Sequence, residues 1–267
     1  MFDYSYHWSS LKEASRGDDG RQGVFDLLSE FEAETSVKKR EELIPGIAGE
    51  LKALYEIPAD KAPSNPHPKS FACAGLYEIP ADKAPSNRLL EKIACDFGVK
   101  EVLKAGIVQE GACLLGKGEF YILYSAESKT MKNYVLAHEL GHYLLSHCGK
   151  SIHEAITERE ADQFAYAVCN FSADRIESAV WWNTFLTVLK SPAHLVRRKS
   201  EIRRLKDKDI YAGLKESADE FYTFCGICAG AYPLAVVAGL LAYILSQSAY
   251  PGDCNTNLLK PQNTRTQ

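Results

Sequence analysis

The chain has 267 residues, of which 46% are hydrophobic and 25% are charged, values typical of a globular protein with a core of its own. This length allows one large domain or two smaller ones. The formal net charge of −4 gives no overall sign of the strongly basic domain that nucleic-acid binding usually requires, so we expect no direct contact with nucleic acid. The first residues contain neither a basic start nor an apolar run, which predicts no secretory signal and a cytoplasmic location.

Eight cysteines are spread along the chain. In a protein that is not secreted, we expect them to be reduced thiols, several of them in the core. Cys225 and Cys228 are the only close pair, and a CxxC pair can be redox-active or bind a metal. Because this pair lies in an apolar stretch with no second pair and no histidine nearby, a structural role is favoured.

The N-terminal region, residues 1–53, is polar with two amphipathic patches. VFDLLSEFEAE at 24–34 and REELIPGIAGELKALY at 40–55 each predict a helix. Pro45 and Gly46 are expected to interrupt the second helix. A helix-turn-helix is compatible with this order, although no specific motif supports one.

An identical repeat follows, because LYEIPADKAPSN occurs both at 54–65 and at 76–87. Two copies are too few for a solenoid, which needs at least about three units to bury a continuous core. Each copy contains two prolines and ends in a polar turn, which favours an extended linker over 54–87. We interpret the repeat as a tandem duplication tolerated in a loop, where added length costs little. The alternative is a sequence-assembly artefact.

The next two segments predict a helix and then a hairpin. RLLEKIACDFGVKEVLK at 88–104 has apolar residues at helical spacing, which indicates an amphipathic helix. GACLLGKGEFYILYS at 111–125 has two apolar runs on either side of a glycine-containing turn at 116–118, which indicates a hairpin. Its second run, FYILY at 120–124, is rich in residues that favour strands.

Three helices are predicted after the hairpin, at 132–146, at about 154–169 and at 173–190. Trp181 and Trp182 lie in the third. We expect both to be core or helix-packing residues rather than a platform for a ligand.

The C-terminal part combines a basic stretch with an apolar one. Residues 194–209 are locally basic, and a solvated helix face is favoured over an anionic contact site. Residues 225–246 contain no charged residue, which meets the length and composition test for a membrane span. The alternative is a pair of buried helices in an enlarged core. If the segment spans a membrane, the basic residues that precede it favour a cytoplasmic N-terminal domain anchored to the inner face of the cell membrane.

The strongest chemical signal is His-Glu-Leu-Gly-His at residues 138–142. Side chains four apart on a helix project from the same side, so His138 and His142 can bind one zinc ion at about 2.0–2.1 Å. Glu139 lies beside the metal without needing to bind it. That position suits the general base that activates a water molecule.

A second predicted helix supplies the acidic partners of this motif. A catalytic zinc ion needs a third protein ligand and an open fourth position, and Glu158 can be that ligand. Asp162, one turn further on, can accept a hydrogen bond from a ligand histidine and fix its tautomer. Glu160 is the competing candidate. The alternative is that His138 and His142 are ordinary partly buried histidines, which would make the neighbouring acids a coincidence.

Two further side chains near the motif are candidates for substrate contacts. Tyr143 or His147 could help to stabilise the oxyanion of a cleaved peptide, although spacing alone does not show it. His147 and His153 are expected on the surface or at the rim of the cleft.

HELGHYLLSH followed by EREADQFA resembles the ImmA/IrrE family of metallopeptidases, over about residues 88–170. The resemblance places His138, His142 and Glu158 at the family's ligand positions and Glu139 at its catalytic position. It implies an α/β (α+β) fold like that of the gluzincins, mostly helical with a small sheet, and one Zn2+ per chain. It also implies a bacterial cytoplasmic regulator that cleaves a helix-turn-helix transcriptional repressor.

Some features depart from the family pattern. The segment after EREADQFAYAVC lacks the family's Leu-Leu-Met-Pro-like ending, and the repeat and the apolar C-terminal stretch are not family features. These departures bear on the substrate and the location rather than on the metal site.

The expected domains are a polar helical region (1–53), a Pro-rich linker (54–87), a zinc metallopeptidase domain (88–190), a basic helical extension (191–224), an apolar segment (225–246) and a polar tail (247–267).

The sequence also leaves room for other functions. We expect the strand at 120–124 to pair with an extended substrate by strand addition. One alternative is a zinc-stabilised module that captures a protein without cutting it, which is disfavoured because structural zinc sites usually have four protein ligands. Another is a membrane-anchored sensor whose apolar C-terminus transmits a signal to a peptidase-like domain.

Overall fold

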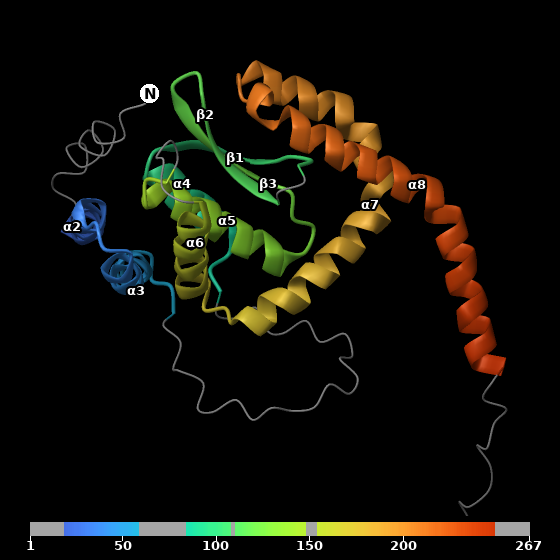
Figure 1. The fold of residues 1–267 in the computed structure, drawn as a ribbon, viewed down its shortest axis with the longest axis horizontal. Coiled ribbons are helices and arrows are strands. Elements are labelled where there is room, and N and C mark those ends of the chain that lie inside the picture. The colour runs from blue at the N-terminus through green and yellow to red at the C-terminus, as the bar shows by residue number, and fades with distance from the viewer. Residues whose placement is uncertain (1–18, 59–83, 108–109, 148–153, 249–267) are drawn as a thin grey trace, which may run out of the picture.

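A computed structural model of the chain describes residues 19–58, 84–107, 110–147 and 154–248, and for 232–248 it describes the helical backbone alone. The helices are α2 (Asp19–Ala33), α3 (Val37–Leu54), α4 (Asn87–Asp96), α5 (Lys129–Leu144), α6 (Glu154–Cys169), α7 (Ala173–Asp207) and α8 (Tyr211–Ser248). The strands are β1 (Val99–Lys104), β2 (Gly111–Gly116) and β3 (Glu119–Tyr124). The described part is mostly helical with a small sheet, as the α+β expectation stated (Figure 1).

The three strands form one sheet in the order β1-β3-β2. β2 and β3 are antiparallel and joined at Lys117 and Gly118, whose φ angles are +53° and +79°. These left-handed conformations suit a tight hairpin turn, so the predicted hairpin is confirmed. β1 pairs in parallel with the other side of β3. β3 is therefore the central strand, and β2 is an edge strand.

The predicted helix at 88–104 is wrong in its second half. α4 ends at Asp96, and Gly98 has a φ of +99°, a conformation that glycine adopts readily and that stops the helix. After Gly98, Val99 and Leu103 are buried whereas Lys100 is exposed. This segment pairs with β3 and becomes β1, because the tertiary partner outweighs the local helical spacing.

Helix α5, which carries the HELGH motif, lies between the sheet and α6. It contacts β2, β3 and α4, and it packs against α6. A β-carbon at Gly141 would stand 3.0 Å from Phe164 Cδ1 and 3.3 Å from Ala161 Cα, so this glycine allows α5 and α6 to approach closely. The predicted helices at 132–146 and 154–169 are confirmed to within a few residues. Their close contact brings the two sequence motifs together.

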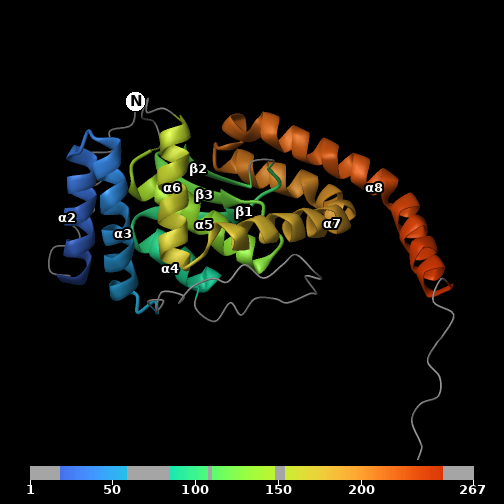
Figure 2. The same ribbon diagram turned by 60° about the horizontal axis from the view of Figure 1, so that its bottom comes forward.

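Helices α2 and α3 lie side by side at one end of the molecule, with α3 against α6 (Figures 1 and 2). The expected interruption at Pro45 is wrong, because α3 continues through it. Proline removes one helical hydrogen bond, but Ile44, Ile47 and Leu51 are all buried along one side of the helix. Their burial stabilises the helix despite the lost bond. The linker at 54–87 lies outside the described residues except at its ends.

Residues 173–248 form two long helices, α7 and α8, at the opposite end of the molecule (Figure 2). The predicted helix at 173–190 and the basic stretch at 194–209 form one helix, α7, with Pro192 inside it. The predicted apolar segment, 225–246, lies in the single helix α8 rather than in a helix pair. Within the residues that the structure describes, none of the helices is both long and apolar enough to cross a membrane. The expected membrane anchor therefore gains no support.

Trp181 and Trp182 were expected to be core or helix-packing residues, and the structure shows that neither lies in the core. Their exposed fractions are 75% and 44%. Trp182 stacks on Phe185, with ring centroids 5.3 Å apart, on the outer side of α7. The side of α7 that packs inward carries the polar residues Asn183 and Thr187 as well as the apolar residues Ile176 and Ala179.

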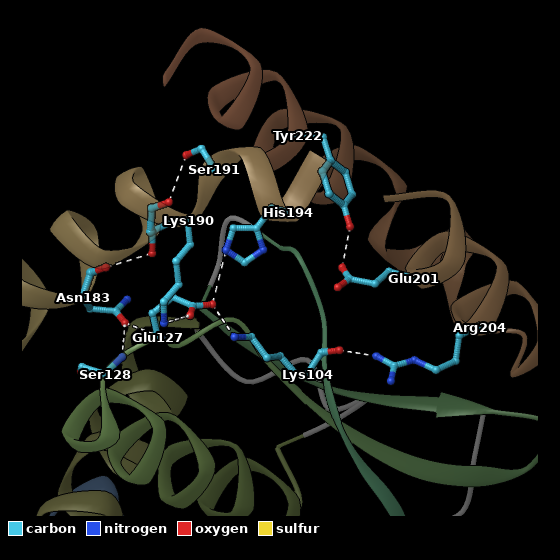
Figure 3. Close-up of polar contacts among 11 residues, drawn as sticks. Lys104, Glu127, Ser128, Asn183, Lys190, Ser191, His194, Glu201, Arg204 and Tyr222 are labelled. Carbon is cyan, nitrogen blue, oxygen red and sulfur yellow. Dashed lines mark hydrogen bonds and ion pairs between the residues drawn. The ribbon is translucent and has the colours of Figure 1, made fainter. Parts of the chain in front are cut away.

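A polar cluster connects α7 to the start of α5 (Figure 3). Glu127, whose side chain is 3% exposed, forms ion pairs with Lys104 at the end of β1 and with Lys190 of α7. Its Oε1 atom also lies 3.4 Å from Nε2 of His194. Asn183 Oδ1 accepts hydrogen bonds from the backbone N–H groups of Glu127 and Ser128, at 2.7 and 3.1 Å. Ser128 is the N-cap of α5, so the α7 side chains hold the N-terminus of the helix that carries the HELGH motif.

Candidate metal centre

The two motifs meet where α5 crosses α6. The Nε2 atoms of His138 and His142 are 2.9 Å apart, and each lies 3.3 Å from one carboxylate oxygen of Glu158. The three residues form a group whose potential ligand atoms all lie within 4.8 Å of one another. The structure thus brings together the three side chains that the sequence predicted as metal ligands.

The hydrogen bonds behind the histidines fit a metal ion. His138 Nδ1 lies 2.8 Å from Asp162 Oδ1, which is the contact predicted for Asp162. His142 Nδ1 lies 3.1 Å from His147 Nδ1. Because both Nδ1 atoms have partners, both Nε2 atoms face the Glu158 carboxylate. Two imidazole lone pairs and a carboxylate that converge on one point repel one another unless a cation lies between them.

The electrostatics of the group agree with this geometry. Burial lowers the pKa of His138, but hydrogen bonds to Asp162 and Glu158 outweigh it and raise the pKa to about 10. Hydrogen bonds from His138 and His142 hold the pKa of Glu158 well below its usual range. The site therefore strongly favours positive charge at its centre, and a divalent cation can supply that charge in place of a proton.

Glu139 is buried beside this group, with 6% of its surface exposed. Burial raises its pKa to about 7, although the two neighbouring histidines and a hydrogen bond to the Cys113 backbone oppose the rise. It is not among the three residues that could hold a metal ion. Strand β2 packs directly against it.

The motif opens into a cleft of about 750 Å³. One wall is β2 with the residue before it, and the others are α5 and α6; the side chains include Glu110, Cys113, Tyr134 and Thr157. The expectation that the strand at 120–124 receives a substrate is wrong, because β3 is hydrogen-bonded to a strand on each side. The edge strand β2, which pairs with β3 alone among the described strands, faces the cleft instead.

Three other predicted residues lie elsewhere than expected. Tyr143 is fully buried, packs on Phe120 and donates a hydrogen bond to the backbone oxygen of Phe97, so it does not reach the cleft. His147 lines the cleft but is buried behind His142 rather than on the surface, and burial lowers its pKa. Glu160, the competing ligand candidate, is fully buried and bound to His147 and Arg40. His153 lies outside the described residues.

Sequence reasoning missed two residues of the site. The Tyr134 hydroxyl donates a hydrogen bond to Asp162 Oδ1 and lines the cleft. It lies four residues before His138, on the same side of the predicted helix, so this spacing could have revealed it. Arg40 contacts Glu160 from 120 positions away, and no local pattern indicates that contact.

The comparisons with known proteins bear on the segment that contains this site. Residues 87–169 match the peptidase family M78 model, described as the IrrE N-terminal-like domain. This span begins at the first residue of α4, ends at the last residue of α6 and contains both motifs. Neither the curated proteins nor the solved structures gave a match. The match covers less than half of the chain, and over residues 87–169 it agrees with the resemblance to the ImmA/IrrE family of metallopeptidases.

Proposed function

We propose that the protein is a zinc-dependent endopeptidase in which His138, His142 and Glu158 hold the metal. The observation that carries the proposal is the convergence of their ligand atoms within 4.8 Å, beside a buried glutamate and at the base of a cleft. A zinc ion supplies Lewis-acid chemistry, since it lowers the pKa of a water molecule and polarises the carbonyl of the scissile bond.

In this proposal the chain's own residues transfer the proton and orient the metal ligands. Glu139 accepts a proton from the attacking water and passes it to the leaving amine. Its burial favours the protonated form, so the carboxyl group can hold that proton between the two steps. Asp162 holds His138 with Nε2 turned toward Glu158, and Tyr134 holds Asp162. Such supporting contacts keep ligand histidines in one orientation and tautomer.

The substrate we propose is an extended segment of another protein. β2 presents the backbone groups of an edge strand to the cleft, and an extended peptide can pair with such an edge. This arrangement requires a locally unfolded stretch, which limits cleavage to exposed linkers and loops of a folded protein. The family resemblance supports a bacterial helix-turn-helix repressor as the target, with cleavage in the cytoplasm.

The test measures zinc and cleavage in the full chain and three variants. We expect about one zinc ion per chain in the wild type and in Glu139→Gln, and little in His142→Ala or Glu158→Ala. Incubation with a proteome-derived peptide library, read by mass spectrometry, should give new cleavage sites with the wild type alone. Folded wild type that binds no zinc would overturn the proposal.

Two other outcomes are informative. Cleavage by Glu139→Gln at the wild-type rate would remove Glu139 from the mechanism. Zinc binding with no cleavage of peptides or of candidate repressors would favour the non-catalytic binding module instead.

A further inference from the structure

We propose that Arg40 of α3 positions the metal ligand His142, acting through Glu160 and His147. The inference rests on the proposed metal site and adds to it a positioning residue outside the segment that matches the peptidase family. It makes the N-terminal helices part of the metal site rather than an attached unit.

The contacts run without a break from α3 to the ligand. Arg40 Nη2 lies 2.8 Å from Glu160 Oε2, and His147 Nε2 lies 3.0 Å from the same oxygen. His147 Nδ1 then lies 3.1 Å from His142 Nδ1. The side chains of Arg40, Glu160 and His147 are 11%, 0% and 2% exposed. Water therefore competes little for these hydrogen bonds.

The metal ligand His142 and the carboxylate of Glu160 together determine which nitrogen of His147 carries the proton. A histidine that binds a metal through Nε2 carries its proton on Nδ1, so His142 donates to His147 Nδ1. His147 must then accept at Nδ1 and carry its own proton on Nε2, which it donates to the Glu160 carboxylate. If His147 took the other tautomer, two N–H groups would face each other. His142 would then turn or shift its proton to Nε2, where the metal should bind.

Arg40 is what keeps Glu160 an acceptor. A carboxylate with no exposed surface is costly unless a charged partner is present, and the guanidinium of Arg40 is that partner. Its charge is permanent and its planar donors suit a carboxylate. The ring of Phe31 from α2 covers the guanidinium, with the ring centroid 4.5 Å from Cζ, and lies 6.5 Å from the His147 ring. Both N-terminal helices thus enclose the contact.

The two ligand histidines are therefore oriented in different ways. His138 is held by Asp162 and Tyr134, which both lie within residues 87–169. His142 is held through a carboxylate whose cation comes from residue 40, outside that span. The matched segment alone would lack the counter-charge for Glu160.

The test compares zinc affinity among full-length variants by competition with a chromogenic chelator. Arg40→Met keeps the length of the side chain and removes its charge, and we expect zinc affinity to fall about 10–100-fold, as for other residues that support a metal ligand. Arg40→Lys should restore most of the affinity. Arg159→Met is the matched control, because Arg159 pairs with Glu41 across the same α3–α6 contact, is 55% exposed and does not touch His147. It should bind zinc like the wild type.

Several results would overturn the inference. Wild-type zinc affinity in Arg40→Met would do so, and so would an equal loss in Arg159→Met, which would indicate general loosening of α3. Thermal unfolding of the zinc-free chains checks folding, and if Arg40→Met does not fold, Glu160→Leu, which removes the acceptor of the His147 hydrogen bond, replaces it with the same expected loss. Failure of the wild type to bind zinc would defeat the proposed metal site itself, a separate and recognisable result.

Discussion

The Glu139 carboxylate lies so close to strand β2 that a β-carbon at Gly111 would stand 2.4 Å from its Oε1 atom. The same β-carbon would be 2.7 Å from Val135 Cγ1, so the helix side chains have little space in which to yield. We predict that Gly111→Ala displaces the proposed general base and lowers kcat/KM at least about 100-fold, since a misplacement of about 1 Å can have that effect. Zinc content should stay near one ion per chain.

Gly213→Ala is the control for this substitution. A β-carbon there meets nothing within 4 Å, so activity and zinc content should be unchanged. Peptide cleavage and metal analysis of both variants provide the check. A fully active Gly111→Ala enzyme would show that Glu139 does not need its observed position.

Asp162 orients His138 from the second motif, and we predict that Asp162→Ala weakens zinc binding about 10–100-fold. The His138 ring would lose the partner of its Nδ1 atom and with it the preference for one tautomer. Glu154→Ala removes a carboxylate of the same helix that also lines the cleft, so it matches the change in charge. Equal losses in both variants, measured by chelator competition, would show that negative charge matters rather than the contact with His138.

The candidate metal site was predictable because its signals are local. His138 and His142 project together at a spacing of four on any helix, and Glu158 and Asp162 repeat that spacing on the next one. The hairpin was predictable for the same reason, since its turn residues lie between two apolar runs. These patterns specify single elements and the pairing of neighbours in sequence.

The errors occurred where distant parts of the chain decide the structure. β1 has helical spacing, but it becomes a strand because β3 offers a partner. Tyr143 has a polar group and lies beside the motif, yet its hydroxyl bonds to Phe97, 46 residues away. Arg40 completes the surroundings of His142 from α3, and no pattern near either residue indicates it. Contacts of this kind follow from packing rather than from periodicity.

The exposed position of Trp181 on α7 can be tested directly by substitution. Its side chain is 75% exposed, so Trp181→Ala should change the free energy of unfolding by no more than about 0.5 kcal/mol, as is usual for surface substitutions. Phe164→Ala is the buried comparison, with a loss of about 3–5 kcal/mol, because Phe164 is fully buried where α6 meets α5. Urea denaturation measures both. A large loss at Trp181 would restore the expectation that it packs in a core.

Glu127 joins α7 to the start of α5, and its removal should destabilise the fold. Burial raises the pKa of Glu127, but contacts with His194, Lys104 and Lys190 outweigh it and hold the pKa well below the usual range. We predict that Glu127→Gln lowers the free energy of unfolding by about 2 kcal/mol at pH 7, within the range for hydrogen bonds to charged groups. The side chains of Lys104 and Lys190 are partly exposed, so the loss of unfolding free energy should be smaller than for a fully buried ion pair.

The pH dependence of the unfolding free energy distinguishes the effect of the charge on Glu127 from an effect of side-chain packing at this position. Because folding lowers the pKa of Glu127, its stabilising effect is fully present above the pKa of the unfolded chain, about 4.3, and is lost as the pH falls toward the folded value. The difference between the wild type and Glu127→Gln should therefore shrink steadily below about pH 4. Glu119→Gln, which breaks an exposed pair with Lys100, should leave stability near that of the wild type. A difference for Glu127→Gln that stays constant down to pH 2.5 would mean that packing, rather than the charge on Glu127, holds α7 against the N-terminus of α5.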